Sequence, residues 1–323
     1  MDVADLIILK SIPRLGDVTL RKIVTEFQSS GIASLASDEA PQILLSKPYS
    51  RFHDAFKDLL RPSELHRQQL STNLLIKTIK EHNHTKVIGI SDDWYPKSLM
   101  RLNDAPCILY ARGNIKLLQQ QATIAIVGTR NPTTLGKNIA AKTTDYFSQN
   151  GVVVVSGLAL GIDTEVHTAC LAANGHTVAV LADIYIISPN SNRSLAQDII
   201  HNDGLLLSEN PPNTKIIPAH FVKRDRLQSA LSMAVFIIES SKDGGSLHAA
   251  GIAKKLSIQT YVPDPIQAGY LKGVKQIEGT LELLSSGDAK SYSKESYAGI
   301  LSSIEHPHVS ATMSLPSHEG SLF

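Results

Sequence analysis

Two apolar segments that each end in a glycine turn set the first constraint on this chain. Residues 123–127 (TIAIV) run directly into residues 128–130 (GTR), and residues 152–155 (VVVV) run into residues 156–157 (SG). Glycine adopts backbone angles that other residues avoid, so such turns bring amide N–H groups close to a ligand. In α/β proteins these turns meet at the carboxyl edge of a parallel sheet. The sequence therefore predicts an α/β protein with an anion site at that edge.

The pattern of apolar runs beyond residue 86 predicts alternating strands and helices. Short continuous apolar runs are typical of strands that are covered on both faces, and they alternate here with segments at helical spacing. The strand-like runs are residues 86–90, 105–110, 176–181, 205–207, 235–239 and 259–262, and the helix-like segments include 194–201 and 246–256. This alternation predicts a Rossmann-like, doubly wound, mainly parallel sheet.

The amino-terminal part of the sequence has a different, purely helical pattern. Between residues 2 and 70, apolar residues recur three and four positions apart, which predicts a small helical module of the helix-hairpin-helix or SAM-like type. Residues 12–17 (IPRLGD) form its first turn, and we expect a left-handed Gly16 there. Such a turn either grips a DNA phosphate through its amides or simply packs two helices, and packing is the favoured interpretation.

Changes in periodicity divide the chain into three parts. We predict a helical module at residues 1–70, a Rossmann-like domain at residues 74–285, and a weakly ordered tail at residues 286–323. The tail is assigned because Ser, His and Pro become frequent after residue 285 and periodicity fades.

Composition restricts the classes of function. The 323 residues carry a formal net charge of only +1, so any nucleic-acid surface must be a local patch. Cys107 and Cys170 are far apart without metal-ligand spacing, which argues against a zinc site or a disulfide. No signal-like start and no apolar run of about 18 residues is present, so we expect a cytoplasmic protein outside the membrane.

Cationic side chains indicate phosphate binding. Arg130 follows a glycine turn directly, so its planar guanidinium can meet an anion held there. His220, Lys223, Arg224 and Arg226 form the densest cationic cluster, which we expect on one exposed turn or helix start facing DNA phosphates. A solvated surface is the alternative for that cluster.

Two further constellations raise the question of catalysis. Asp163 and His167 are four residues apart and would share a helix face, which suits a general base or a capping network equally well. Glu239 followed by residues 243–246 (DGGS) has the pattern of a nucleotide-phosphate cradle. No activated nucleophile accompanies either group, so a non-enzymatic protein is the favoured interpretation and nucleotide hydrolysis the alternative.

Several short motifs are spread over most of the chain. They are residues 95–99 (YPKSL), 106–113 (PCILYARG), 128–130 with Gly136, 156–163 (SGLALGID) with His167, 208–209 (SE), 221–226 (FVKRDR), and 245–247 (GSL) with Ala250. Together these motifs resemble those of the DNA-processing protein A (DprA, or Smf) family. The resemblance implies a single-stranded DNA-binding protein that dimerises through its Rossmann domain and hands DNA to the RecA recombinase, with no established reaction.

The chain also departs from the family pattern. Residues 182–189 (ADIYIISP) lack the glycines and the Tyr-Pro pair of the family's Gly-x-Gly-x-Asp segment, and Asp225 stands where the family has Asn. The last forty or so residues are too few for the winged-helix domain that many members carry. We therefore expect a divergent member without that domain.

Three functions remain open at this point. The first is a single-stranded DNA-binding recombination mediator in DNA uptake or competence, and the second is a nucleotide-binding sensor or hydrolase. The third is a regulatory or antitoxin partner in a phage-defence module. The residues that we predict to bind DNA or phosphate are Gly128, Thr129, Arg130, Ser156, Gly157, Lys223, Arg224, Arg226, Gly244, Gly245 and Ser246. We predict no catalytic residue, metal or cofactor; the expected partners are single-stranded DNA, RecA or a toxin, and a second copy of the chain.

Overall fold

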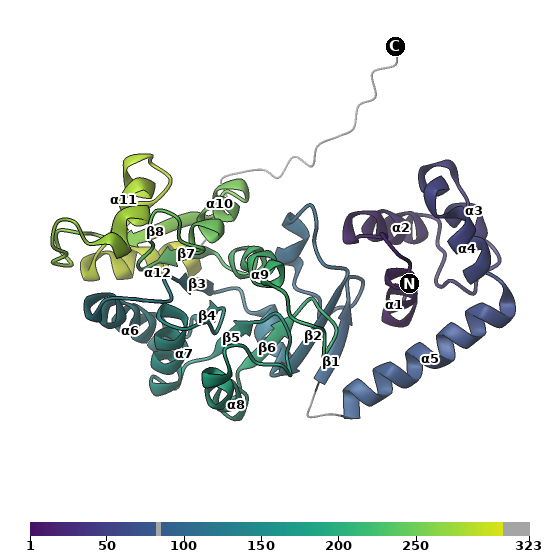
Figure 1. Cartoon of the computed structure of the whole chain (residues 1–323), viewed down its shortest axis with the longest axis horizontal. Helices are drawn as coiled ribbons and strands as arrows, with labels where there is room; N and C mark the ends of the chain where they lie inside the picture. Colours follow the sequence, from purple (N-terminus) through teal and green to yellow (C-terminus); the bar gives the residue numbers. More distant parts are fainter. Residues whose placement is uncertain (82–84, 306–323) are drawn as a thin grey trace, which may run out of the picture.

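The fold is a nine-stranded sheet between two helical layers, with a helical module beyond strand β1 (Figure 1). The computed structural model describes residues 1–81 and 85–305. The strand order is β1-β2-β6-β5-β4-β3-β7-β8-β9. In this order, every pair of neighbouring strands from β6 to β9 is parallel, whereas β1 pairs with β2 and β2 pairs with β6 in antiparallel orientation. The strands are β1 (Thr85–Gly89), β2 (Ile108–Gly113), β3 (Thr123–Val127), β4 (Val153–Ser156), β5 (Thr177–Val180), β6 (Leu205–Ser208), β7 (Ala234–Ile237), β8 (Gln259–Pro263) and β9 (Lys290–Tyr292).

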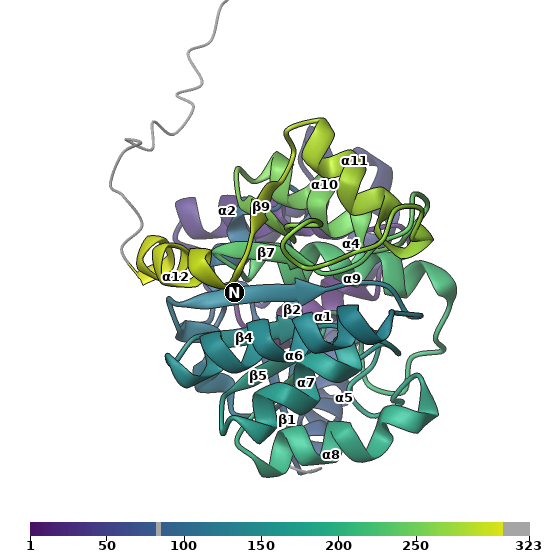
Figure 2. The ribbon, with the colours of Figure 1, turned by 90° about the vertical axis from the view of Figure 1, so that its left-hand side faces the viewer.

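Helices cover both faces of the sheet because its apolar side chains point both ways. Ile124 and Ile126 pack under α6 (Thr134–Gln149) and α7 (Ile162–Ala172), whereas Ala125 and Val127 pack under α10 (Leu247–Lys255). The face covered by α6 and α7 also carries α8 (Arg193–His201) and α12 (Tyr297–Glu305). The face covered by α10 also carries α9 (Pro218–Ala230) and α11 (Glu278–Ser285). Figure 2 shows α6 and α7 side by side across the sheet. The predicted doubly wound α/β fold is confirmed.

The chain reverses its winding direction at β3. From β3 the sheet grows through β4, β5 and β6 on one side, and through β7, β8 and β9 on the other. Val127 pairs with Ile237, and the amide of Thr129 donates to the main-chain oxygen of Glu239 at 2.7 Å just past the strand ends. Crevices at such reversal points are the usual ligand sites of open α/β sheets.

The amino-terminal module is longer than predicted and is fixed to the sheet. It contains α1 (Val3–Lys10), α2 (Asp17–Ser29), α3 (Ala40–Leu44), α4 (His53–Leu59) and α5 (Pro62–Glu81). The predicted boundary at residues 70–74 is wrong because α5 continues through it. The amide of Cys107 donates to the carboxylate of Asp17, and Arg21 donates to the main-chain oxygen of Leu102 at 2.9 Å.

The turn between α1 and α2 differs from the prediction. Arg14 is left-handed, with φ of 67°, whereas Gly16 has φ of −82° and serves as the N-cap of α2. Asp17, next along the chain, forms an ion pair with Lys10 at 2.6 Å. These contacts hold the turn against the rest of the protein, which supports the packing interpretation.

The prediction of a weakly ordered tail from residue 286 is wrong for residues 286–305. Those residues form β9 and α12, and residues 306–323 lie outside the described part. The ring of Tyr292 meets Phe236 edge-on at 5.1 Å, and the hydroxyls of Tyr292 and Tyr297 both meet that of Thr143, at 2.9 and 2.8 Å. The segment therefore completes the core beside β8.

Both cysteines are buried, free thiols. Burial raises the pKa of Cys107 to about 12 and that of Cys170 to about 11. The thiol of Cys170 accepts a hydrogen bond from Ser148 at 3.2 Å, between α6 and α7. Across residues 1–81 and 85–305, no helix has both the length and the apolar character to cross a membrane.

We expect Tyr292→Ala to lower the free energy of unfolding by about 3 kcal/mol, because it empties a large buried site and breaks the contact with Thr143. Lys290→Ala, at an exposed position of the same strand, is the control and should change it by less than about 0.5 kcal/mol. Urea unfolding followed by circular dichroism measures both. Equal stability of the two variants would contradict a core role for β9.

Candidate functional site

A cavity of about 380 Å³ lies where the winding reverses, at the carboxyl ends of β3 and β7. Its walls come from the turn after β3, the start of α7, the middle of α9 and the start of α10. Seven predicted residues lie on it, namely Gly128, Thr129, Arg130, Arg224, Gly244, Gly245 and Ser246. Ser156, Gly157, Lys223 and Arg226 are not part of its lining.

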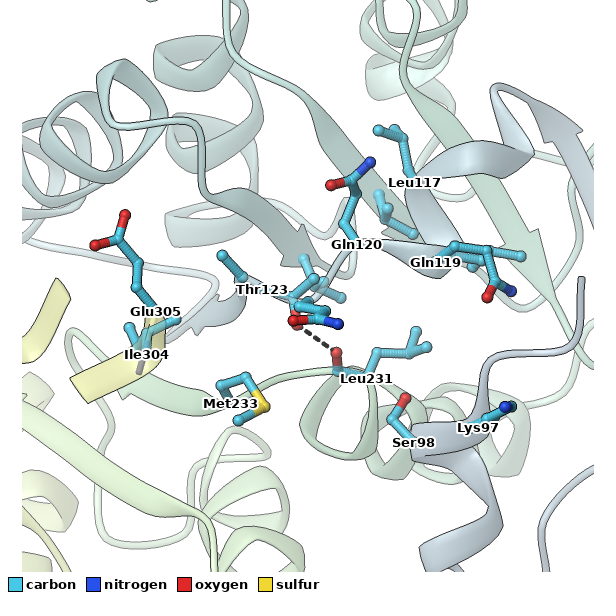
Figure 3. Close-up of a pocket in the computed structure, with 15 residues that line it drawn as sticks. Lys97, Ser98, Leu117, Gln119, Gln120, Thr123, Leu231, Met233, Ile304 and Glu305 are labelled. Atoms are coloured by element: carbon cyan, nitrogen blue, oxygen red, sulfur yellow. Dashed lines mark hydrogen bonds between the residues drawn. The ribbon is translucent and has the colours of Figure 1, made fainter. Parts of the chain in front are cut away.

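A larger cavity of about 1020 Å³ lies beside Thr123, at the start of β3, and Met233, just before β7 (Figure 3). The Thr123 hydroxyl donates to the main-chain oxygen of Leu231 at 2.6 Å there. None of the buried polar side-chain atoms that lack a partner in the described residues belongs to its lining. The smaller cavity contains several, so the smaller one is the candidate site.

Arg130 stands at the mouth of the candidate site. It is exposed, and within residues 1–81 and 85–305 it takes part in no ion pair. Its guanidinium carbon lies 6.0 Å from the ring centre of Phe221, which is half-buried. Val222 is 52% exposed beside it. The mouth thus combines one accessible cation with an aromatic and an aliphatic surface.

The glycine turns are required for close approach rather than for unusual backbone angles. Neither Gly128 nor Gly157 has positive φ; in the second turn Leu158 and Gly161 do, with φ of 57° and 80°. A Cβ at Gly157 would lie 2.8 Å from the Asp163 carboxylate and 2.9 Å from the Arg224 guanidinium. Any larger residue there would displace two charged groups at the cavity.

The prediction that the cationic cluster is exposed is wrong for Arg224 and Arg226. Arg224 and Arg226 are 5% and 6% exposed. Arg224 donates to the main-chain oxygens of Gly157 and Val180, the latter at 2.9 Å. Its position on α9 directs it inward, toward the ends of β4 and β5.

Arg226 and Lys223 share a carboxylate on another side of α9. Arg226 meets Glu209 at 2.9 Å and Asp104 at 2.8 Å, and Lys223 meets Glu209 at 2.9 Å. Lys223 remains exposed, but its charge is compensated. The remaining member, His220, is half-buried. Among the predicted arginines, Arg130 is therefore the exposed one.

Glu239 is a structural group rather than a catalytic one in this geometry. It is completely buried, and its carboxylate accepts hydrogen bonds from the amide and hydroxyl of Thr133 at 2.9 and 2.5 Å and from the hydroxyl of Tyr270 at 2.9 Å. These contacts hold the start of α6, where Thr133 caps the amide of Gly136. Glu239 does not line the cavity.

Asp163 and His167 also serve the interior. His167 is completely buried, contacts the Thr177 hydroxyl at 2.8 Å, and has its pKa lowered to about 3 by burial. It is therefore neutral and away from the cavity wall. Asp163 lines the cavity; burial raises its pKa, which the charge of Arg224 opposes.

The floor of the cavity contains a residue that the sequence did not indicate. Gln228 lines it at 2% exposure and donates to Asp225 at 3.2 Å. Burial raises the pKa of Asp225 to about 7. The spacing of three residues on a helix was the signal that could have placed Gln228 beside Asp225. Within residues 1–81 and 85–305 no group of three or more potential metal ligands occurs.

Several known proteins are similar to this chain in sequence. The DNA processing protein DprA of Bacillus subtilis is 39% identical over 195 residues, covering 58% of this chain and 65% of that protein. The Smf protein of Synechocystis is 33% identical over 216 residues, covering 65% of this chain and 52% of that protein. The matches thus span about two thirds and about half of these relatives.

Solved structures share the fold. DNA processing protein A from Helicobacter pylori superposes with a TM-score of 0.61 at 29% identity, over 70% of this chain and 98% of that one. DNA processing protein A from Streptococcus pneumoniae superposes with a TM-score of 0.74 at 23% identity, over 93% of this chain and 98% of that one. This match supports the fold. The model of the family described as DNA recombination-mediator protein A matches residues 86–302, most of the chain. The chain therefore belongs to the DNA recombination-mediator protein A family.

Proposed function

We propose that this protein binds single-stranded DNA and acts as a recombination mediator. The observation that carries the proposal is Arg130, an exposed and unpaired cation within the described residues, standing beside the Gly128 turn and Phe221 at a cavity mouth. A guanidinium suits phosphate oxygens, and apolar surface suits the faces of unpaired bases. The H. pylori relative, which binds single-stranded DNA, supports this assignment.

The strand runs over the mouth of the cavity in this proposal. Phosphates meet Arg130, and bases meet Phe221 and Val222. Arg224 and Arg226 support the site from within, because Arg224 donates to main-chain oxygens and Arg226 donates to carboxylates. Transfer of the strand to RecA and dimer formation, which the family resemblance implies, complete the proposal, together with the cytoplasmic location that the composition predicts.

Arg130→Ala should weaken binding of a labelled 20-nucleotide oligo-dT and reduce the slope of log K against log salt by roughly 0.7, the value for one lost phosphate contact on single strands. The matched control is Arg61→Ala, which removes an exposed arginine on the distant amino-terminal module. Fluorescence anisotropy across a salt series measures both.

Duplex of the same length should bind less well than oligo-dT, since it hides its bases from Phe221 and Val222. The proposal fails if wild type does not bind oligo-dT at low salt. It also fails if Arg130→Ala and Arg61→Ala have the same salt slope.

Affinity for oligo-dT should fall as pH rises from 6 to 8. Asp225, with a pKa raised to about 7, ionises over this range. Arg224, Asp163, Arg130 and His248 are the charged or titratable groups that line the cavity with it. A new carboxylate repels a nearby phosphate by about 1 kcal/mol, or roughly fivefold in affinity. Asp225→Asn should flatten the profile above pH 6.5, and an unchanged profile would contradict this role.

Nucleoside monophosphates should survive incubation with the protein without release of free base. Glu239, which the nucleotide-binding interpretation places at a phosphate cradle, has its carboxylate hydrogen-bonded to Thr133 and Tyr270 and does not line the cavity. Chromatography of the nucleotide after incubation provides the measurement. Base release by wild type that Glu239→Gln abolishes would establish the enzyme instead.

A further inference from the structure

The segment between β5 and α8, residues 181–192, lies outside the cavity lining but is anchored to the rest of the protein. Asp183 in this segment is buried, and its carboxylate accepts from three main-chain amides, including that of Thr214 at 2.9 Å. The side chain of Ile187 is buried in the core. The segment ends at Asn192, which directly precedes α8. Asn192 is therefore held in a fixed position.

The side-chain amide of Asn192 contacts the turn that follows β4. Its Nδ2 donates to the main-chain oxygens of Leu158 and Ala159 at 3.0 and 3.3 Å, and to the hydroxyl of Thr164 at 2.9 Å. That hydroxyl donates in turn to the main-chain oxygen of Ala159 at 2.7 Å. Asn192 is only 5% exposed, and its side chain does not cap α8. The amide group of Asn192 thus links the start of α8 to the turn after β4.

The turn after β4 has a backbone conformation that requires such support. Leu158 has φ of 57°, a left-handed angle that is unfavourable for a residue with a Cβ. A residue keeps such an angle only where its surroundings determine it. Two contacts do so here: the Leu158 side chain is completely buried, and its main-chain oxygen accepts from Asn192. Loss of the Asn192 amide would remove one of these two supports.

The same turn lies against the main chain that carries Arg130. The amide of Ile162 donates to the main-chain oxygen of Thr129 at 3.2 Å. Gly161 has φ of 80°, and a Cβ at this position would lie 2.7 Å from the carbonyl carbon of Arg130. Because the two segments approach so closely, a shift of residues 158–161 would also move residues 129–130.

We infer that Asn192 is a positioning residue of the DNA site, an inference that rests on the proposed function. Its amide fixes residues 158–161, and those residues fix the main chain from which the Arg130 guanidinium reaches a phosphate. Asn192 is buried and does not line the cavity, so it acts through these contacts rather than by touching the strand. A guanidinium binds phosphate oxygens through directional N–H bonds, so displacement of its main chain weakens that contact.

The test is a double-mutant cycle between Asn192→Leu and Arg130→Ala. Leu is close to Asn in shape, has no hydrogen to donate and adds no charge. Asn192→Leu should weaken binding of labelled 20-nucleotide oligo-dT about tenfold, because a hydrogen bond to a charged group contributes about that factor. It should also lower the salt slope by roughly 0.7, as Arg130→Ala does. Combining the two changes should cause little further loss, because both remove the same contact.

Asn202→Leu is the matched control for a purely structural effect. Asn202 is exposed at the end of α8, and its side chain donates to the main-chain oxygen of Asp198 at 2.7 Å. The control therefore removes a similar hydrogen bond from the same helix and leaves the turn after β4 intact. Its affinity for oligo-dT and its salt slope should equal those of wild type.

A second pair of variants tests the same contact without changing Asn192. Thr164→Val keeps the shape of the side chain but removes the hydroxyl that joins Asn192 to Ala159, so it should weaken binding and lower the salt slope. Thr164→Ser keeps the hydroxyl and should bind as wild type does. This pair decides the question if Asn192→Leu does not fold, which urea unfolding followed by circular dichroism establishes.

The outcomes separate the inference from the proposed function. If Arg130→Ala lowers the salt slope but folded Asn192→Leu keeps the wild-type slope, the inference is overturned and the proposed function stands. The same holds if Arg130→Ala weakens binding by an equal factor with and without Asn192→Leu, or if Thr164→Val binds as Thr164→Ser does. If wild type binds no oligo-dT, the proposed function itself fails, and this inference fails with it.

Discussion

The buried guanidinium of Arg224 is the contact on which the carboxyl edge of the sheet depends. It donates to the main-chain oxygens of Gly157 and Val180, and so ties helix α9 to the ends of β4 and β5. A buried cation is costly unless its charge and its hydrogens are compensated. Asp163 and Asp225 provide the negative charge. One side chain thus fixes α9 against the sheet and shapes the floor beneath Arg130.

The fold was predictable because its signals are local. Continuous apolar runs such as that of β3 predict strands that are buried on both faces, and the glycine turns after β3 and β4 mark the strand ends. Arg130 could be placed for the same reason, since it directly follows one such turn. The boundary at residues 70–74 failed because no Gly or Pro interrupts α5 after Pro62, so the helix continues through the boundary to Glu81.

The rest of the site depends on partners that are distant in the sequence. Arg224 and Arg226 look like one cationic cluster, but Gly157, Val180, Asp104 and Glu209 lie between 17 and 122 residues away and neutralise them or direct them inward. The strand β9 was missed for a related reason. Its three residues (KSY) form no apolar run, and only Tyr292 enters the core.

The positions of the two thiols give the protein a pair of internal reporters. Cys107 lies where the amino-terminal module meets the sheet, and Cys170 lies between α6 and α7. A thiol-specific reagent can reach either sulfur only when the surrounding packing opens, and the raised pKa values keep both sulfurs protonated and slow to react. Detachment of the module and separation of the two helices would therefore label different residues. Both sulfurs are buried in the part of the chain that the structure describes. A dye that reacts with thiols on the folded protein would therefore label a cysteine introduced at the surface and neither native one.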